Sequence, residues 1–256
     1  MIKTLNGLRI LNTRPIGAAK TLTHELIEAG GLVIECPTLA IQEKSADWVN
    51  HLPALQSIQH AIFISPNAVH FAFKHLQEQQ ITWPKSINLI PIGQATANAL
   101  KEQGLFCNDI PSLSNSEHLL ELPALKHVQD QSVLLFKGVG GRPLIEEVLG
   151  HRGAKVFTQL LYERVMPRLN PEWLELIWRN NQVDIILLTS EQSIENLFKL
   201  FGKEASSWLQ TKPCLVISDR LAHSASIFGI QNIIKSHPEK IINTLFDYSQ
   251  GLFHGQ

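Results

Sequence analysis

The chain of 256 residues has few of the features that mark several classes of protein. It contains only three cysteines, Cys36, Cys107 and Cys214, which lie far apart in the sequence. An odd and widely spaced set argues against a disulfide framework and favours a reducing compartment. No apolar run approaches the roughly 20 residues that a membrane-spanning helix needs, and the first residues lack the pattern of a secretory signal peptide. We therefore expect a cytoplasmic protein without membrane contact.

An excess of charge of one sign is also missing. The 22 lysines and arginines nearly balance the 23 aspartates and glutamates, which gives a formal net charge of −1. No global field would therefore attract nucleic acid or an acidic membrane surface. An anionic ligand would have to be held by local groups. The 44% of hydrophobic residues suffice for a substantial core, and the length suggests one large domain or two of ordinary size.

Motifs for metal ions and nucleotides are lacking as well. The 11 histidines form no HExxH or similar spacing and the cysteines form no CxxC pair, so we expect no metal site. The glycine-rich turn KGVGGR, residues 137–142, has Pro143 where a dinucleotide fingerprint needs its third glycine, and no GK[ST] follows it. These absences disfavour a nucleotide-dependent transferase, and we expect no cofactor. No GxSxG motif of a serine hydrolase is present either.

What the chain does contain is a regular alternation of apolar runs, turns and amphipathic stretches. The stretch from Val133 to Arg164 is the clearest example, with a strand, the basic KGVGGR turn, a helix opened by Pro143 and ended by Gly153, and a second strand. Such alternation predicts an α/β fold with parallel sheets covered by helices on both faces. Further strands are predicted over residues 8–12, 32–34, 61–65, 89–92, 183–188 and 214–217, and 37–41 is expected to be extended. Helices are predicted over 19–29, 66–73, 95–103, 114–122, 194–201, 220–228 and 238–248.

The two halves of the chain share this pattern. The matching positions are Arg14 with Lys137 and Gly30 with Gly153 at an offset of 123, and Ser65 with Ser190 and Gly93 with Ser218 at an offset of 125. A nearly constant offset indicates an internal duplication, and hence two similar α/β domains. The alternative is a chance agreement between generic strand–helix patterns.

Ligands of open α/β sheets bind beyond the carboxyl ends of the strands. The predicted turns between strands and helices lie there, and we expect them to line a cleft between the two domains. The candidate binding residues are Thr13, Arg14, Ser65, Asn67, Lys137, Gly138, Gly141, Arg142, Thr189, Ser190, Ser218 and Arg220. Arg142 could clamp a carboxylate through two bonds, Lys137 could add a point charge, and helix N-termini could bind anions. The alternatives are a flexible loop with surface charges at residues 137–142 and plain helix capping by Ser65 and by the Thr189-Ser190 pair.

Tyr162 lies at the end of the strand that leaves the central stretch. A tyrosine there could lend a proton to a leaving hydroxyl group. The alternative is an aromatic side chain packed at the edge of a domain, which the residue type alone favours.

Taken in order, these stretches resemble the uroporphyrinogen-III synthase family. The matching segments are LRILNTRPIGAAKTLTHELIEAGGLVIECPTLAI, IFISPNAVHFAF, IPIGQATANALKEQGL, LLFKGVGGRPLIEEVLGHRGAKV and LYERVMP. Each segment is weakly specific, but the ordered set covers nearly the whole chain. Three positions depart from the family pattern. Lys137 replaces the usual arginine, the second serine turn reads SEQSI from Ser190, and Ser218-Asp219-Arg220 replaces a glycine and threonines.

The resemblance implies a discontinuous first domain, residues 1–35 with 169–256, and a second domain, residues 43–159. Residues 36–42 and 160–168 would be paired linker strands. It implies a cyclising hydro-lyase, active as a monomer, that closes the linear tetrapyrrole hydroxymethylbilane to uroporphyrinogen III with inversion of the last ring and loss of water. Tyr162 would assist loss of the hydroxyl group, and the candidate binding residues would hold the substrate's carboxylates. A two-domain module that closes on a small ligand without chemistry remains the alternative.

Overall fold

A computed structural model describes residues 4–251 of the chain. The described residues form two compact units, the first made of residues 4–40 with 165–251 and the second of Ile41–Arg164. The chain therefore crosses from one unit to the other twice, after residue 40 and after residue 164.

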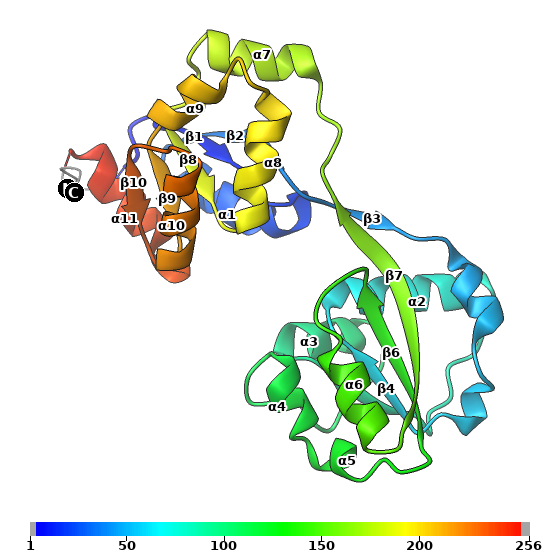
Figure 1. Cartoon of the computed structure of the whole chain (residues 1–256). Helices are drawn as coiled ribbons and strands as arrows, with labels where there is room; N and C mark the ends of the chain where they lie inside the picture. Colours follow the sequence, from blue (N-terminus) through cyan, green and yellow to red (C-terminus); the bar gives the residue numbers. More distant parts are fainter. Residues whose placement is uncertain (1–3, 252–256) are drawn as a thin grey trace. The chain divides into compact units, whose positions relative to one another are not determined.

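The first unit contains a five-stranded sheet in the order β10-β9-β8-β1-β2, and each neighbouring pair is parallel (Figure 1). The strands are β1 (Arg9–Asn12), β2 (Leu32–Glu35), β8 (Ile185–Leu188), β9 (Cys214–Val216) and β10 (Ile233–Lys235). In the register of β1 and β8, Ile10 lies opposite Ile185. The N-terminal strand is thus held between one neighbour close in sequence and another from the C-terminal part of the chain.

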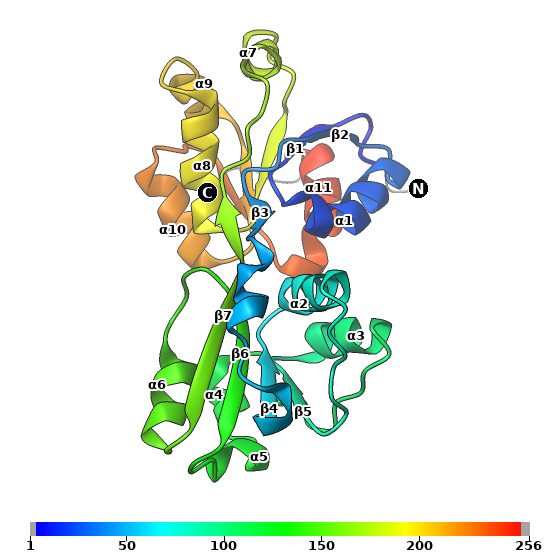
Figure 2. The same ribbon diagram turned by 90° about the vertical axis from the view of Figure 1, so that its right-hand side faces the viewer.

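Helices cover both faces of this sheet (Figure 2). They are α1 (Ile16–Glu28), α7 (Pro171–Arg179), α8 (Glu191–Phe201), α9 (Ser206–Thr211), α10 (Asp219–Ile227), the 3-10 turn η3 (Pro238–Lys240) and α11 (Ile241–Ser249). Successive residues of a strand point to opposite faces. Ile10 and Leu187 accordingly pack with α1 and α11, whereas Leu11 and Leu188 pack with α7, α8 and α10. The four apolar residues of β8 are all buried, as expected for a parallel strand covered on both sides.

The second unit contains a five-stranded sheet in the order β3-β7-β6-β4-β5. Its strands are β3 (Ala40–Glu43), β4 (His60–Phe63), β5 (Asn88–Pro91), β6 (Ser132–Gly138) and β7 (Lys155–Val165). Its helices are α2 (Pro66–Glu78), α3 (Gln94–Glu102), α4 (Ser116–Leu120), α5 (Pro123–Lys126) and α6 (Leu144–His151), with 3-10 turns η1 (Ala46–His51) and η2 (Leu55–Ser57). Buried residues of α2 and α3 pack on one face of the sheet, and those of α4, α5 and α6 pack on the other.

Aromatic side chains form the centre of the second unit. The rings of Phe63 and Phe136 stack with centroids 4.7 Å apart, and Trp48 meets Phe136 edge-on at 5.5 Å. Phe73 stacks on Phe63 from α2. Such offset and edge-on pairs are the arrangements that the charge distribution of an aromatic ring favours. They fasten α2 and η1 to the middle of the sheet.

The sheet orders confirm the duplication inferred from the sequence. β1 lies between β8 and β2, and β6 lies between β4 and β7 in the same way. The predicted strands and helices are present, with ends displaced by a few residues. The structure adds α5, α7, α9 and β10. Of these, α7 does have a start signal in the sequence, since the Asn170 side chain accepts hydrogen bonds from two N–H groups and Pro171 occupies the first helical position.

One expectation about the central stretch is wrong. Residues 137–142 do not all form a flexible turn, because β6 continues to Gly138. Lys137 is paired with Leu160 of β7 and Gly138 with Tyr162, with a break in register between them. The turn therefore begins two residues later than the sequence suggests.

We expect replacement of Phe136 by alanine to destabilise the second unit by about 3–5 kcal/mol, the usual cost of emptying a fully buried aromatic site. Phe106, which is 76% exposed, provides the matched control, and Phe106→Ala should cost less than about 0.5 kcal/mol. Hydrogen exchange of amides in the second unit measures both values. Equal protection in the two variants would contradict the packing described above.

A second expectation concerns Asp184, whose carboxylate accepts hydrogen bonds from the backbone N–H and the guanidinium of Arg9. The Arg9 guanidinium holds the pKa of Asp184 below its ordinary 3.8. Asp184→Asn should therefore lower the Tm at pH 7 by about 2–4 °C, the shift that about 1 kcal/mol causes in a chain of this size.

The contribution of Asp184 is present above its ordinary pKa and is lost as the pH falls through its lower folded value. The Tm difference between wild type and Asp184→Asn should therefore shrink on acidification below about pH 4. Thermal unfolding from pH 7 to pH 3 measures it. A difference that stays constant over this range would show that the carboxylate charge is not the stabilising feature.

Candidate functional site

Most of the predicted binding residues lie in the turns that follow β1, β4, β6, β8 and β9. In a parallel sheet these turns share the edge formed by the carboxyl ends of the strands, which is where α/β proteins bind ligands. Each unit therefore has one polar edge of its own.

Ser65 begins α2 and caps it. Its Oγ accepts a hydrogen bond from the Ala68 N–H at 3.0 Å, and Pro66 follows at the first helical position. Ser190 and Ser218 cap α8 and α10 in the same way. The capping expected of Ser65 and Ser190 is therefore confirmed, and Ser218 is an additional cap. Each cap leaves other N–H groups of the first turn available to an anion.

Tyr162 reaches Ser65 from β7. The two hydroxyl oxygens are 2.8 Å apart, although the residues are 97 positions apart in the sequence. Only 4% of Tyr162 is exposed, and its ring packs near that of Phe71. Only one of the two hydroxyl hydrogens can lie between these oxygens. The other hydroxyl hydrogen is therefore left for another acceptor.

Gly138 lies directly against the Tyr162 ring. A Cβ atom at this position would be 2.6 Å from Cε2 and 2.7 Å from Cζ of the tyrosine. Gly138 is buried in β6, and its assignment as a binding residue stays a prediction. Its observed role is to leave room for the tyrosine.

Lys137 is not the exposed point charge that the sequence suggests. Only 7% of the residue is exposed, and its Nζ donates a hydrogen bond to Oε1 of Glu146 in α6 at 2.7 Å. The other oxygen of Glu146 is buried and has no hydrogen-bond partner among residues 4–251. The lysine is drawn inward because its alkyl stem follows the buried strand while its charge is neutralised.

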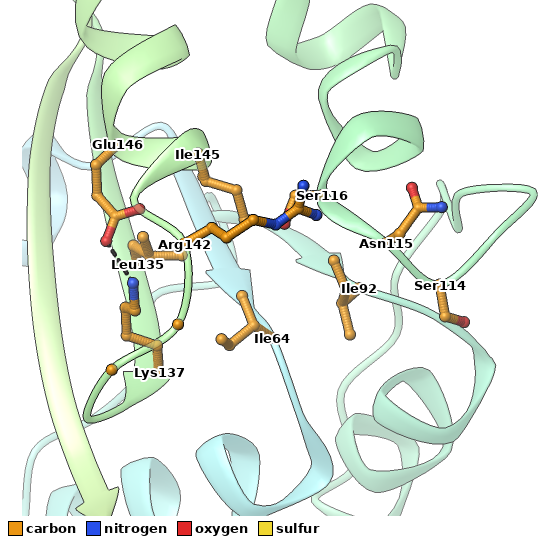
Figure 3. Close-up of a pocket in the computed structure, with 12 residues that line it drawn as sticks. Ile64, Ile92, Ser114, Asn115, Ser116, Leu135, Lys137, Arg142, Ile145 and Glu146 are labelled. Atoms are coloured by element: carbon orange, nitrogen blue, oxygen red, sulfur yellow. Dashed lines mark hydrogen bonds and ion pairs between the residues drawn. The ribbon is translucent and has the colours of Figure 1, made fainter. Parts of the chain in front are cut away.

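A pocket of about 320 Å³ opens beside the end of β6, within the second unit (Figure 3). Ile64, Ile92, Leu135 and Ile145 form its apolar wall, and the Arg142 side chain extends across it towards Ser116. Gly140 and Gly141, both with φ of +83°, let the preceding turn bend around the opening.

Arg142 is the two-bonded clamp that the sequence predicts, but its partner belongs to the chain. Its two terminal nitrogens donate to the two carboxylate oxygens of Glu117 in α4 at 2.6 and 3.1 Å. The Arg142 guanidinium holds the pKa of Glu117 below its ordinary 4.5. Both side chains are largely exposed, so the pair can separate at little cost.

In the first unit, Thr13 does not offer its side chain to a ligand. The residue is fully buried, and its hydroxyl donates to the Leu187 carbonyl at 2.6 Å. Its own carbonyl accepts from the backbone N–H and the hydroxyl of Thr38, and the Thr38 carbonyl accepts from Asn196. The Thr13 hydroxyl therefore has a structural role, and of the two predicted modes of binding, direct or through the backbone, a backbone contact with the substrate stays a prediction.

The remaining predicted residues are more accessible. In the first unit, Arg14 and Thr189 are half-buried and Arg220 is exposed. In the second unit, Asn67 is half-buried and Gly141 is exposed. Nε of Arg220 lies 3.4 Å from Oε1 of Glu191. Arg14 has no ion-pair partner within the part of the chain that the structure describes.

Sequence reasoning missed two kinds of residue. One is the acidic partners of the cations, Glu117 and Glu146, which a search for glutamates in the first turn of a helix would have found. The other is the set of residues that follow β10, a strand that the sequence did not predict. Ser236, His237 and Lys240 of this set line a pocket of about 470 Å³. No group of three residues suited to hold a metal ion occurs among residues 4–251.

Two α/β units, each with a mainly parallel sheet and with capped helices and cationic side chains at one edge of that sheet, define a two-domain α/β protein. A sequence model of the family described as "Uroporphyrinogen-III synthase HemD" matches residues 20–241. The chain therefore belongs to the uroporphyrinogen-III synthase family.

Individual relatives agree with this assignment. The chain is 30% identical to uroporphyrinogen-III synthase of Escherichia coli (strain K12), over 88% of this chain and 94% of that protein. It is 33% identical to the enzyme of Synechococcus elongatus, over 77% and 76%. Two solved structures share the fold, each with a TM-score of 0.60: a mutant uroporphyrinogen III synthase of Thermus thermophilus, at 19% identity over 96% of this chain and 99% of that one, and uroporphyrinogen-III synthetase of Helicobacter pylori 26695, at 15% identity over 96% and 100%. Within the described residues, no helix is long and apolar enough to cross a membrane.

We expect Gly138→Ala to push the Tyr162 ring away from Ser65, because the new methyl group would overlap ring atoms that are held by packing. Overpacking of this kind costs about 1–3 kcal/mol. Gly150→Ala is the matched control, since Gly150 lies in α6 and a methyl group added there would have nothing within 4 Å, so alanine should be neutral or stabilising by up to about 1 kcal/mol. Thermal unfolding and the near-ultraviolet tyrosine signal measure both effects, and an undisturbed Gly138→Ala variant would contradict the described contact.

Proposed function

We propose that the chain catalyses the closure of hydroxymethylbilane to uroporphyrinogen III, with inversion of the last ring and loss of water, in tetrapyrrole biosynthesis. The match to the family over residues 20–241 carries this proposal. The hydrogen bond between Tyr162 and Ser65 at a sheet edge also supports the proposal, because it leaves a hydroxyl hydrogen that can be donated to the leaving group. We also propose that the protein is a monomer and acts in the cytoplasm. The molar mass measured by light scattering tests the oligomeric state.

The chemistry needs one proton delivered and one removed. The substrate's hydroxyl group leaves as water once it is protonated, and an electrophilic azafulvenium cation remains. The substituted carbon of the last ring attacks it to give a spiro intermediate, which fragments and closes again in the inverted sense. The ring carbon that forms the final bond gives up its hydrogen as a proton, so the proton spent on water is recovered. No electron is transferred to or from an external partner in this sequence.

In this proposal Tyr162 assists departure of the hydroxyl group. When the Ser65 hydroxyl donates to the Tyr162 oxygen, the phenol hydrogen is left to donate to the substrate. The same hydrogen bond stabilises the phenolate that forms when the proton is given away. Ser65 therefore supports the tyrosine in addition to capping α2, and the tyrosine acts as the general acid.

Binding of the substrate's acetate and propionate groups falls to the polar edges of the two units. Ser65, Ser190 and Ser218 mark helix N-termini whose N–H groups can donate hydrogen bonds to anions without any excess of positive charge. Arg14, Arg142 and Arg220 supply guanidinium groups, and Lys137 supports the turn from within. Asn67, Thr189 and the backbone at Gly141 complete the proposed set. Once the substrate is held in the productive conformation, much of the rate enhancement follows from positioning the attacking carbon.

The direct test supplies hydroxymethylbilane and determines which uroporphyrinogen isomer forms. We expect the inverted isomer in excess over the enzyme-free reaction. An isomer mixture identical to that of the enzyme-free control would refute the proposed function and leave the non-catalytic binding module.

Tyr162→Phe keeps the ring and removes the hydroxyl. We expect kcat to fall by about 100-fold, the lower end of the contribution of a general acid, while product binding changes less. Tyr248→Phe is the matched control, because Tyr248 belongs to α11 of the first unit. This substitution should leave kcat unchanged. If Tyr162→Phe turns over at the wild-type rate, the proposed role of the tyrosine is wrong, whatever the isomer assay shows.

A further inference from the structure

The pocket beside the end of β6 combines an apolar wall with three charged side chains, Lys137, Arg142 and Glu146, that take no part in the proposed loss of water. The wall is formed by isoleucine and leucine side chains from or just beyond β4, β5, β6 and α6. Ser114, Asn115 and Ser116 line the pocket where α4 begins. The pocket therefore offers an apolar wall next to hydroxyl and amide groups, as a site for a small polar ring would.

The cations of the pocket are both paired within the chain, but unequally. The Lys137 and Glu146 side chains are 8% and 25% exposed, whereas those of Arg142 and Glu117 are 65% and 47% exposed. Removing one partner of a buried pair leaves an uncompensated charge, which is costly. An exposed pair separates easily. Of these two cations, Arg142 is the one that can change its partner at low cost.

We propose that this pocket binds one carboxylate-bearing pyrrole ring of the tetrapyrrole, and that the ring's carboxylate takes the place of Glu117 on Arg142. The inference rests on the proposed function for the identity of the ring. A pyrrole presents apolar faces, one N–H donor and, in this substrate, acidic side chains. The pocket answers each in turn, with its aliphatic wall, the hydroxyl groups of Ser114 and Ser116, and the Arg142 guanidinium (Figure 3).

Glu117 then acts as an internal competitor. Its carboxylate meets the guanidinium through two parallel bonds, the arrangement that a substrate carboxylate would adopt. It keeps Arg142 extended across the opening when no ligand is present. A ligand without a carboxylate cannot displace it, so Glu117 contributes to specificity for acidic rings.

Glu117→Gln tests the competition. Glutamine keeps the shape of the side chain and removes the charge that competes for Arg142. We expect the KM for hydroxymethylbilane to fall by about two- to fivefold, the range that exposed ion pairs support, with a smaller change in kcat. Glu121→Gln is the matched control, since Glu121 is exposed at the end of the same helix and forms no ion pair with another described residue. It should change KM much less.

A single-ring probe tests the pocket without turnover. Porphobilinogen, a monopyrrole with acetate and propionate groups, should shift the NMR signals of amides 114–116 and 140–142, and should bind Glu117→Gln about two- to fivefold more tightly than wild type. In an Arg142→Gln background, binding should be weaker and Glu117→Gln should give no further gain. Unchanged thermal stability of these surface variants is the check that they fold.

The proposal is overturned if Glu117→Gln and Glu121→Gln behave alike, if the gain persists without Arg142, or if porphobilinogen shifts signals only elsewhere. Each of these results leaves the synthase function intact when wild-type protein still forms uroporphyrinogen III. Failure of the isomer assay is a separate outcome, because the porphobilinogen measurement reports on the pocket independently of turnover.

Discussion

The position of β1 between β2 and β8 is the constraint on which the first unit depends. A strand of four residues buries too little surface to be stable alone, but here it is paired on both sides and covered on both faces. The pairing joins the start of the chain to its C-terminal part, and the Arg9–Asp184 bonds fasten the beginning of the two strands. Because all neighbours are parallel, the turns after β1, β8 and β9 are brought to one edge.

The same arrangement in the second unit creates the part of the site most closely tied to chemistry. β6 separates β4 from β7, and the ends of these strands bring Ser65 and Tyr162 within hydrogen-bond distance. Gly138 permits this because it places no side chain where the tyrosine ring lies. The catalytic proposal for the tyrosine therefore rests on the order of the strands as much as on the residue itself.

Charge pairing explains how a nearly neutral chain can serve an anionic substrate. Lys137, Arg142 and Arg220 each lie against a glutamate in the first turn of a helix, where the helix dipole favours negative charge. The cations are thus kept in place without a large positive field. Only the exposed pairs can exchange their glutamate for a ligand, so burial decides which cations are available.

The sequence by itself was sufficient for the alternation of strands and helices, the duplication, the capping serines and the family resemblance. These features depend on local periodicity, on Pro and Gly at element ends and on the order of short motifs, all of which can be read along the chain. It could not show that the Thr13 hydroxyl is bound to a backbone carbonyl, that Gly138 still belongs to β6, or that Glu117 occupies Arg142. Partners separated by tens to hundreds of residues decide these points. Only the tertiary structure fixes which donor meets which acceptor and how far water is excluded from them, and these two quantities determine whether a polar residue holds the fold together or remains available to a ligand.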